Sequence, residues 1–272
     1  MIEWMAAAAW ALAARADIGP QRCWEKAYDR GVDYALAVIE RPSDNLIVSY
    51  EPMRFWRARG LGTVVVNGTY FGQGQPMGDV LASDGREYHP RYRVLRPGDG
   101  RVVDLGRRWA LGRLRGKGTL AIARDDEAIE TMDLYLGGGA ILLLDGKDLS
   151  ADNLPRGSTP GESFSPDMLS RPAARTAVGL RTVDGRQQLL IVSAPQSAQS
   201  ILSGDILRPR GATLAGMAAL MRRLGATDAV LFDGGGAAGF SAGDGGGGSI
   251  YWSPINASEN LNPTHLAARS CL

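Results

Sequence analysis

Two apolar segments of the sequence end in a polar side chain that is followed by glycine. Residues 63–66 lead into Asn67, and residues 229–232 lead into Asp233 and three glycines. Ligands commonly bind at strand ends, where glycine allows a close approach to the backbone. Asn-Gly and Asp-Gly are also ordinary turn dipeptides. Three consecutive glycines are more than a turn needs, because each adds entropy to the unfolded chain, so the pattern favours a functional Asp233.

The segment after Asp233 fits two other motifs. Residues 234–239 match G-x-G-x-x-G, but the preceding carboxylate would repel a pyrophosphate and no helix is expected to follow. Residues 239–243 match G-x-S-x-G, with Ser241 as a nucleophile and His265 downstream. Glycine flanks this serine where a nucleophile elbow needs a strand and a helix. Dinucleotide binding is therefore disfavoured, and a serine hydrolase is left as an alternative.

Four sequence blocks stand in a recognisable order between residues 60 and 243. They are residues 67–71 with 76–78 and 84–85 behind them, residues 137–147, residues 175–179, and residues 211–214 through 233–236. Together they resemble the phosphodiester glycosidase family, which includes the enzyme that removes N-acetylglucosamine to uncover mannose 6-phosphate. The resemblance implies a hydrolase that cleaves the glycosidic bond between a sugar and a phosphodiester.

Three positions depart from the family pattern. Ala237 stands where the family usually has Ser, Gly216 replaces an acidic residue common in the helix, and residues 193–196 replace an Asp-Gly pair. These departures leave open a non-catalytic glycan- or anionic-polymer-binding protein on the same fold.

The implied reaction assigns roles to four side chains. Loss of a sugar from a phosphodiester passes through an oxocarbenium-like transition state, and a carboxylate can activate water or stabilise the cation. Asp233 is the candidate carboxylate, with Asp79 as a second because glycoside hydrolysis usually uses two. Arg175 can bind two phosphate oxygens at once, or it can form a structural ion pair. Asn67 can donate its amide to substrate, or it can cap a strand end.

Neighbouring residues of the same blocks are predicted to bind substrate, mainly through backbone N–H groups. They are Gly68, Thr69, Tyr70, Gly138, Gly139, Gly234, Gly235 and Gly236. With two His and two widely separated Cys, the chain cannot build a Cys/His zinc cluster. We therefore expect no cofactor and no catalytic metal, while a structural divalent cation stays open.

Charge indicates which partners to expect. The net charge of +1 gives no overall bias toward nucleic acid or anionic membranes. Residues 86–124 nevertheless hold eleven Arg and Lys against three acidic residues. This segment is either a basic surface for an anionic substrate or a solvated strand-and-turn region, and it has few aromatic residues for nucleic-acid stacking. The expected partner is a phosphorylated carbohydrate or sugar phosphodiester, with no nucleic acid.

Hydrophobic patterning predicts the elements that position these residues. Strands are expected at residues 32–50, as a pair around a turn at 41–44, and at residues 63–66, 136–144, 189–193 and 229–233. A helix is expected through Leu224, with Thr213 as N-cap and Gly225 at C′. Residues 150–172 lack periodicity and read as a long loop. The predicted class is α+β (mixed α/β), with a twisted mixed sheet, a few flanking helices and a single domain.

Composition and the chain ends complete the sequence-based picture. Glycine accounts for 36 of 272 residues without a fixed period, which excludes collagen, and the 44% hydrophobic content excludes disorder. Residues 1–16 resemble a secretory signal, although an Ala-rich helix packed on the body is the alternative. An extracytoplasmic domain of residues 17–272, without stable membrane insertion after processing, is expected. Cys23 and Cys271 are either bridged or free thiols.

Overall fold

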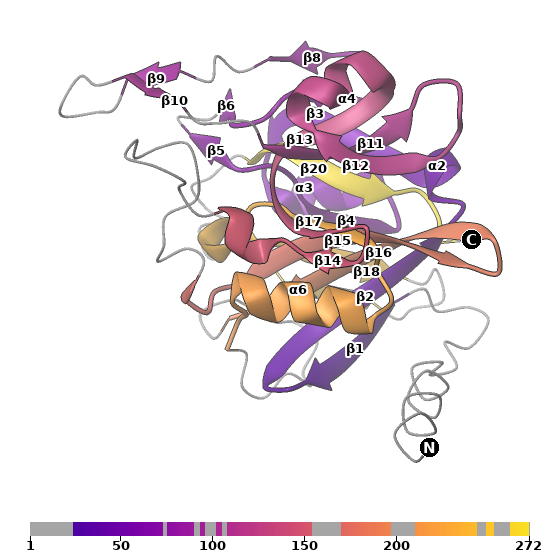
Figure 1. Ribbon diagram of the computed structural model, residues 1–272, viewed down its shortest axis with the longest axis vertical. Helices are drawn as coiled ribbons and strands as arrows, with labels where there is room; N and C mark the ends of the chain where they lie inside the picture. The colour runs from indigo at the N-terminus through magenta and orange to yellow at the C-terminus, as the bar shows by residue number, and fades with distance from the viewer. Residues whose placement is uncertain are drawn as a thin grey trace.

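The computed structural model describes residues 24–72, 75–89, 93–95, 102–104, 108–153, 170–196, 210–243, 249–252 and 262–271 (Figure 1). The signal-like segment 1–16, Cys23 and glycines 245–248 therefore lie outside the described residues. Residues 154–169 of the predicted long loop also lie outside the described residues. Among the described residues, no helix has the length and apolar character needed to cross a membrane.

The larger sheet provides the framework of the fold. Its main strands run in the order β1-β2-β16-β15-β17-β13-β11-β12. Their bounds are β1 Trp24–Asp29, β2 Val32–Glu40, β16 Arg186–Ala194, β15 Arg175–Val183, β17 Asp228–Leu231, β13 Met132–Leu144, β11 Trp109–Leu114 and β12 Leu120–Arg124. Three short strands, β7 Val80–Leu81, β8 Glu87–Tyr88 and β14 Lys147–Asp148, branch from this path.

The smaller sheet runs in the order β19-β18-β4-β20-β3. Its strands are β19 Ser249–Trp252, β18 Phe240–Gly243, β4 Val64–Asn67, β20 Asn262–Ala268 and β3 Leu46–Met53. Two short ladders pair β5 Phe71–Gly72 with β6 Gln75–Pro76, and β9 Arg93–Leu95 with β10 Val102–Asp104.

Strand pairing differs from the prediction in two respects. Every pairing among the described strands is antiparallel, so the sheets are not mixed. The two strands predicted within residues 32–50 do exist as β2 and β3, but they pair with other strands in different sheets. The reason is local: the short helix α2 Pro42–Asn45 follows Arg41, whose φ is 43°, and carries the chain between sheets instead of closing a hairpin.

The helix predicted before Leu224 forms as expected. Helix α6 spans Leu214–Arg223, and its first turn is capped by Thr213, whose Oγ1 accepts from the Gly216 N–H at 3.0 Å. Gly225 follows the helix with φ of 85°. Helix α6 packs on the larger sheet (Figure 1), because Met217 and Met221 join a core cluster that includes Leu142 of β13. Within the described residues, two further short α-helices are α3 Phe55–Ala58 and α4 Asp125–Thr131, and two 3₁₀ helices are η1 Arg59–Leu61 and η2 Ser150–Asn153.

The two sheets pack face to face. One core cluster combines Val66 and Leu266 of the smaller sheet with Leu136, Val178 and Ile191 of the larger sheet. On its other face the smaller sheet is covered by α3, through a cluster that contains Phe55 and Val65. The fold is therefore α+β, as predicted, with apolar strands buried between helix-covered layers.

Cys271 is disulfide-bonded, in agreement with the bridged alternative. The sequence has one other cysteine, Cys23, which lies outside the described residues. Cys271 is buried, and its carbonyl accepts from the Glu40 N–H of β2 at 2.7 Å. The end of the chain is thus tied to the larger sheet.

His265 of β20 is the most unusual buried side chain of the smaller sheet. Its exposed fraction is 0%, and neither ring nitrogen has a hydrogen-bond partner among the described residues. It pairs in register with Asn67 and Ser49, and the Phe55 ring lies 6.2 Å away. Burial lowers the pKa of His265 to about 3, because the charged imidazolium would have to leave water.

We expect this buried imidazole to make the fold sensitive to acid. The unfolded chain takes up a proton near pH 6.5 whereas the folded chain does not, so His265 costs stability as pH falls below about 6.5, by about 1.4 kcal/mol per unit. Between pH 7 and pH 5, wild type should lose more stability in urea titrations than His265→Leu. Identical pH dependence in both proteins would contradict this assignment.

Candidate active site

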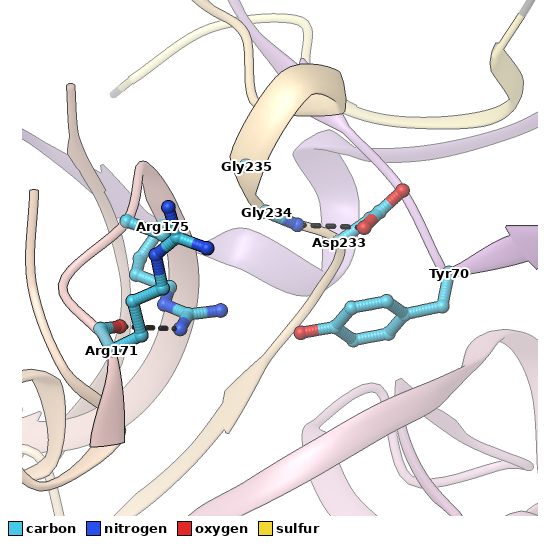
Figure 2. A pocket seen from close by; sticks show the side chains of 7 residues that line it. Tyr70, Arg171, Arg175, Asp233, Gly234 and Gly235 are labelled. Carbon is cyan, nitrogen blue, oxygen red and sulfur yellow. Dashed lines mark hydrogen bonds between the residues drawn. The ribbon is translucent and has the colours of Figure 1, made fainter. Parts of the chain in front are cut away.

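An open pocket of about 360 Å³ lies where strand ends of the two sheets meet. Its lining residues come from three chain segments: after β4, before and at the start of β15, and after β17. They are Tyr70, Arg171, Ala173, Arg175, Asp233, Gly234 and Gly235. Figure 2 shows the two arginines on one side of this space, with Asp233 and Tyr70 on the other. The described residues therefore bring one carboxyl, one phenol and two guanidinium groups to the pocket.

Asn67 joins the segments that form the pocket. The side chain is buried at the end of β4, and its Nδ2 donates to the Asp233 carbonyl at 2.7 Å. Its Oδ1 accepts from Thr176 Oγ1 at 2.9 Å and from the Gly239 N–H at 3.0 Å. The backbone of Asp233 also donates to the Gly68 carbonyl at 3.1 Å. These contacts direct the Asn67 amide toward protein groups and fix the position of Asp233.

Asp233 is partly buried and lines the pocket, with its carboxyl beside the Gly234 turn (Figure 2). One carboxylate oxygen accepts from the Gly234 N–H at 2.8 Å. Burial raises the pKa of Asp233 to about 7, and the Gly234 N–H and the charges of Arg108 and Arg175 limit the rise. A carboxyl that titrates near neutral pH can exchange protons with a substrate or water, which suits general acid or base chemistry.

Arg175 is held so that its guanidinium forms one wall of the pocket. The residue is only 3% exposed, its Nε donates to the Ala212 carbonyl at 3.1 Å, and its Nη2 donates to the Arg171 carbonyl at 3.1 Å. Burial lowers the pKa of Arg175, while Tyr70 and Asp233 oppose that change. Gly234 permits this packing, since a Cβ there would lie 2.6 Å from the Ala174 carbonyl oxygen and 3.4 Å from Arg175 Nη1.

Tyr70, predicted as a substrate-binding residue, lines the pocket. Burial raises the pKa of its phenol, as does the charge of Asp233, so the hydroxyl stays protonated at neutral pH. Arg108, which is 7% exposed, lies over the ring with its Cζ 5.7 Å from the ring centroid. The phenol is therefore held between charged groups and can donate a hydrogen bond to a ligand.

Sequence reasoning missed Arg108, Arg171 and Ala173 as residues of this region. In the sequence Arg108 is one of the many charges of the basic segment 86–124, and no local pattern distinguishes it from the others. Arg171 carries a weak signal, because it lies four residues before Arg175, just ahead of the block at residues 175–179. Its side chain is exposed at the pocket, whereas its carbonyl holds Arg175.

Asp79 does not line the pocket. It is 1% exposed, and its Oδ1 lies 2.9 Å from His89 Nδ1. The hydrogen bond with Asp79 is the largest cause that raises the pKa of His89. The second predicted carboxyl is therefore paired with an imidazole and is not placed opposite Asp233. Asp233 is the one carboxylate among the described residues that line the pocket.

Several of the predicted glycines serve close packing beside the pocket. Gly138 has φ of 84°, and a Cβ there would lie 1.9 Å from Thr69 Oγ1. Cβ atoms at Gly68 and Gly139 would lie 2.4 Å from Thr264 Oγ1 and 2.3 Å from Val230 Cγ2 respectively. The structure thus places Gly68, Thr69, Gly138 and Gly139 in packed layers, outside the lining of the pocket.

The glycines after Asp233 form a turn at the pocket. The N–H of Gly234 donates to Asp233, and the N–H of Gly235 donates to the Ala174 carbonyl at 2.7 Å. These two groups are therefore directed to protein acceptors, and the glycines contribute space. Gly236 belongs to the short 3₁₀ turn Gly235–Ala237.

The two competing motifs do not have the structure that their chemistry requires. A short 3₁₀ turn lies within the G-x-G-x-x-G match, and strand β18 follows the match directly, so no α-helix N-terminus is available for a pyrophosphate. Ser241 is a buried residue inside β18, so it does not lie on a nucleophile elbow. Within the described parts of the chain, no three His, Cys, Asp or Glu side chains are grouped so as to hold a metal ion.

Comparison with known proteins places this chain in a family. The phosphodiester glycosidase family matches residues 62–268, and the chain belongs to that family. The family points to a glycosidase-type enzyme, in agreement with the resemblance noted in the sequence. No curated protein sequence matches the chain.

Two solved structures share the fold. The catalytic domain of zebrafish N-acetylglucosamine-1-phosphodiester alpha-N-acetylglucosaminidase, described as auto-inhibited by its pro-peptide, has a TM-score of 0.59 at 18% identity, over 93% of this chain and 85% of that chain. A hypothetical protein from Synechocystis has a TM-score of 0.53 at 13% identity, over 90% of this chain and 61% of that chain. At these identities the likeness establishes the fold.

The glycine packing predicts a clear difference between two substitutions. Gly138→Ala should lower the free energy of unfolding by about 2 kcal/mol or more, because alanine disfavours positive φ and the new methyl group meets Thr69. Gly60→Ala is the control, since no atom lies within 4 Å of its Cβ position. Urea titration should show a change of about 0.5 kcal/mol or less for the control. Equal effects of the two substitutions would be inconsistent with the packing described.

The Asp233 carboxyl should cost stability at neutral and alkaline pH. Its pKa of about 7 lies above the ordinary value of 3.8, so the folded chain keeps a proton that the unfolded chain has lost between these values. The contribution of the Asp233 carboxyl to the free energy of unfolding of wild type therefore falls as pH rises from about 4 to about 7. Asp233→Asn carries no charge, and its stability advantage over wild type should be larger at pH 8 than at pH 5.

Urea titrations at both pH values measure this difference. Asp84→Asn is the control, because Asp84 is exposed and its pKa is lowered by Arg86. The control should gain no stability at pH 8. A pH-independent difference between Asp233→Asn and wild type would show that the carboxyl is not buried as described.

Proposed function

We propose that this protein hydrolyses the glycosidic bond between a sugar and a phosphodiester. The observation that carries the proposal is the position of Asp233, whose pKa is about 7, in one pocket with the fixed guanidinium of Arg175. A carboxyl able to exchange protons at neutral pH and a cation for phosphate are the two groups that this reaction needs. Family membership supports the same chemistry.

In the proposed reaction, Arg175 and Arg171 bind the phosphate group while Asp233 acts as the base. Asp233 takes a proton from water, the water oxygen bonds to the anomeric carbon, and the bond from that carbon to the phosphate oxygen breaks. The electron pair leaves with the phosphate monoester, whose charge becomes more negative beside the two arginines. Because phosphate is a good leaving group, a second carboxylic acid is not needed, which agrees with the pairing of Asp79 to His89.

The remaining residues have supporting roles in this proposal. Asn67 positions Asp233 through its bond to the Asp233 carbonyl. The Tyr70 hydroxyl donates to a substrate oxygen, and Gly234 and Gly235 leave room for the ligand at the turn. The substrate is a phosphorylated carbohydrate or sugar phosphodiester, handled without a cofactor. The departures Ala237 and Gly216 do not line the pocket, so neither removes a group from it.

We also infer that the protein works outside the cytoplasm, as a domain of residues 17–272. The disulfide at Cys271 supports this, because disulfides persist mainly in oxidising compartments.

Release of sugar from a panel of sugar-1-phosphodiesters tests the proposal. Wild type should turn over at least one substrate, with kcat/KM rising through about pH 7 as Asp233 ionises. Asp233→Asn should lower kcat by about 10²–10⁴-fold, the contribution expected of a general base. Ser241→Ala is the control and should keep wild-type activity.

Two outcomes would reject the proposed reaction. Binding of glycan without turnover across the panel would support the non-catalytic glycan- or anionic-polymer-binding protein. Turnover that survives Asp233→Asn and is lost in Ser241→Ala would support a serine hydrolase instead.

A further inference from the structure

Arg108 is a buried cation that does not itself line the pocket. It directly precedes β11, whose first residue, Trp109, pairs with Gly139 of β13. The adjacent Gly138 packs against Thr69, the neighbour of Tyr70 in sequence. This register brings a residue of the basic segment 86–124 next to the pocket, although most of that segment's charges were expected at the surface.

Arg108 contacts the pocket through the Tyr70 ring. The guanidinium carbon lies 5.7 Å from the ring centroid, within the range of a cation–π interaction. Since Tyr70 lines the pocket and Arg108 does not, the guanidinium supports the ring from outside the ligand space. Such a contact is stronger when the cation is removed from water, and Arg108 is only 7% exposed.

The charge of Arg108 also reaches Asp233. The charged and titratable groups that act on the Asp233 carboxyl are Arg108, Arg175 and, through its phenol, Tyr70, while Arg171 lines the same pocket. Arg108 and Arg175 both lower the pKa of Asp233 against the larger effect of burial. Arg175 is anchored by two carbonyls at the ligand space, whereas Arg108 exerts its effect from behind the ring.

We propose that Arg108 is a positioning residue of the pocket, which holds the Tyr70 ring from outside the ligand space and adds a buried positive charge beside the group formed by Tyr70 and Asp233. The catalytic consequence rests on the proposed role of Asp233 as the base. The effect of the Arg108 charge on the Asp233 carboxyl does not rest on that role, because it is measured in the protein without substrate.

A carboxyl titration followed by ¹³C NMR tests this effect of the Arg108 charge directly. The Asp233 signal is identified by its loss in Asp233→Asn, and its midpoint in wild type is expected near pH 7. Arg108→Met should raise the midpoint by on the order of one unit, because a nearby positive charge is removed. Arg108→Lys should keep the midpoint close to wild type, since it retains the charge.

Arg124→Met is the matched control. Arg124 also lies over an aromatic ring, with its Cζ 5.5 Å from the Trp109 centroid, but it is not among the groups that act on Asp233. The titration midpoint of Asp233 in Arg124→Met should equal the midpoint in wild type. A folded Arg108→Met with an unchanged midpoint, or an Arg108→Lys that shifts as far as Arg108→Met, would overturn the proposal.

A second measurement uses wild type and Asp233→Asn, and it does not depend on the folding of Arg108→Met. The guanidinium resonances of Arg108 should shift with a midpoint near pH 7, and this response should vanish in Asp233→Asn. No such response in wild type would overturn the proposal.

Activity then separates this inference from the proposed function. With an active substrate, Arg108→Met should lower kcat/KM about tenfold at pH 6, as a one-unit shift requires, with much less effect at pH 9. If no substrate is turned over while the NMR shifts occur, the proposed function fails and the electrostatic role of Arg108 stands.

Discussion

The side-chain amide of Asn67 is the interaction on which the pocket depends. It binds the Asp233 carbonyl on one side, and Thr176 Oγ1 and the Gly239 N–H on the other. These partners belong to β15 of the larger sheet and to the segments on either side of the glycine turn. A buried amide that loses such partners costs about 1–3 kcal/mol for each unsatisfied group. The position of Asp233 is therefore coupled to the packing of the two sheets.

Opposing electrostatic effects determine how Asp233 behaves. Burial alone would keep the carboxyl protonated, and full exposure to water would keep it ionised at neutral pH. The Gly234 N–H, Arg108 and Arg175 counteract burial, and the pKa of about 7 is the balance of these effects. Perturbed groups of this kind are concentrated at functional sites, where reactivity is gained at a cost in stability. The pocket has this perturbed character even though Asp233 is the single carboxyl among its described lining residues.

The glycine excess builds the pocket mainly through close packing of the backbone. Gly78 and Gly138 approach so closely that a Cβ on Gly78 would lie 2.0 Å from the Gly138 nitrogen. Gly68 packs in a similar way against Thr264, and Gly234 lets the backbone at Ala174 approach the turn. The glycine blocks of the sequence therefore lie beside the pocket, although the block at residues 137–139 is inside β13 and not at a strand end. Their physical role is to bring β4, β13 and β17 together, so that side chains from distant segments line one space.

The sequence by itself determined the local elements and the two central residues. Apolar runs predicted the buried strands, Thr213 and Gly225 predicted the ends of α6, and the glycine and arginine blocks pointed to Asp233 and Arg175. Such signals depend on residues a few positions apart. Tertiary structure decided that β2 and β3 separate, that Asp79 pairs with His89, and that Arg108 supports Tyr70. These outcomes follow from contacts between distant segments, such as Asn67 with Thr176 across 109 residues, which local patterns of polarity do not encode.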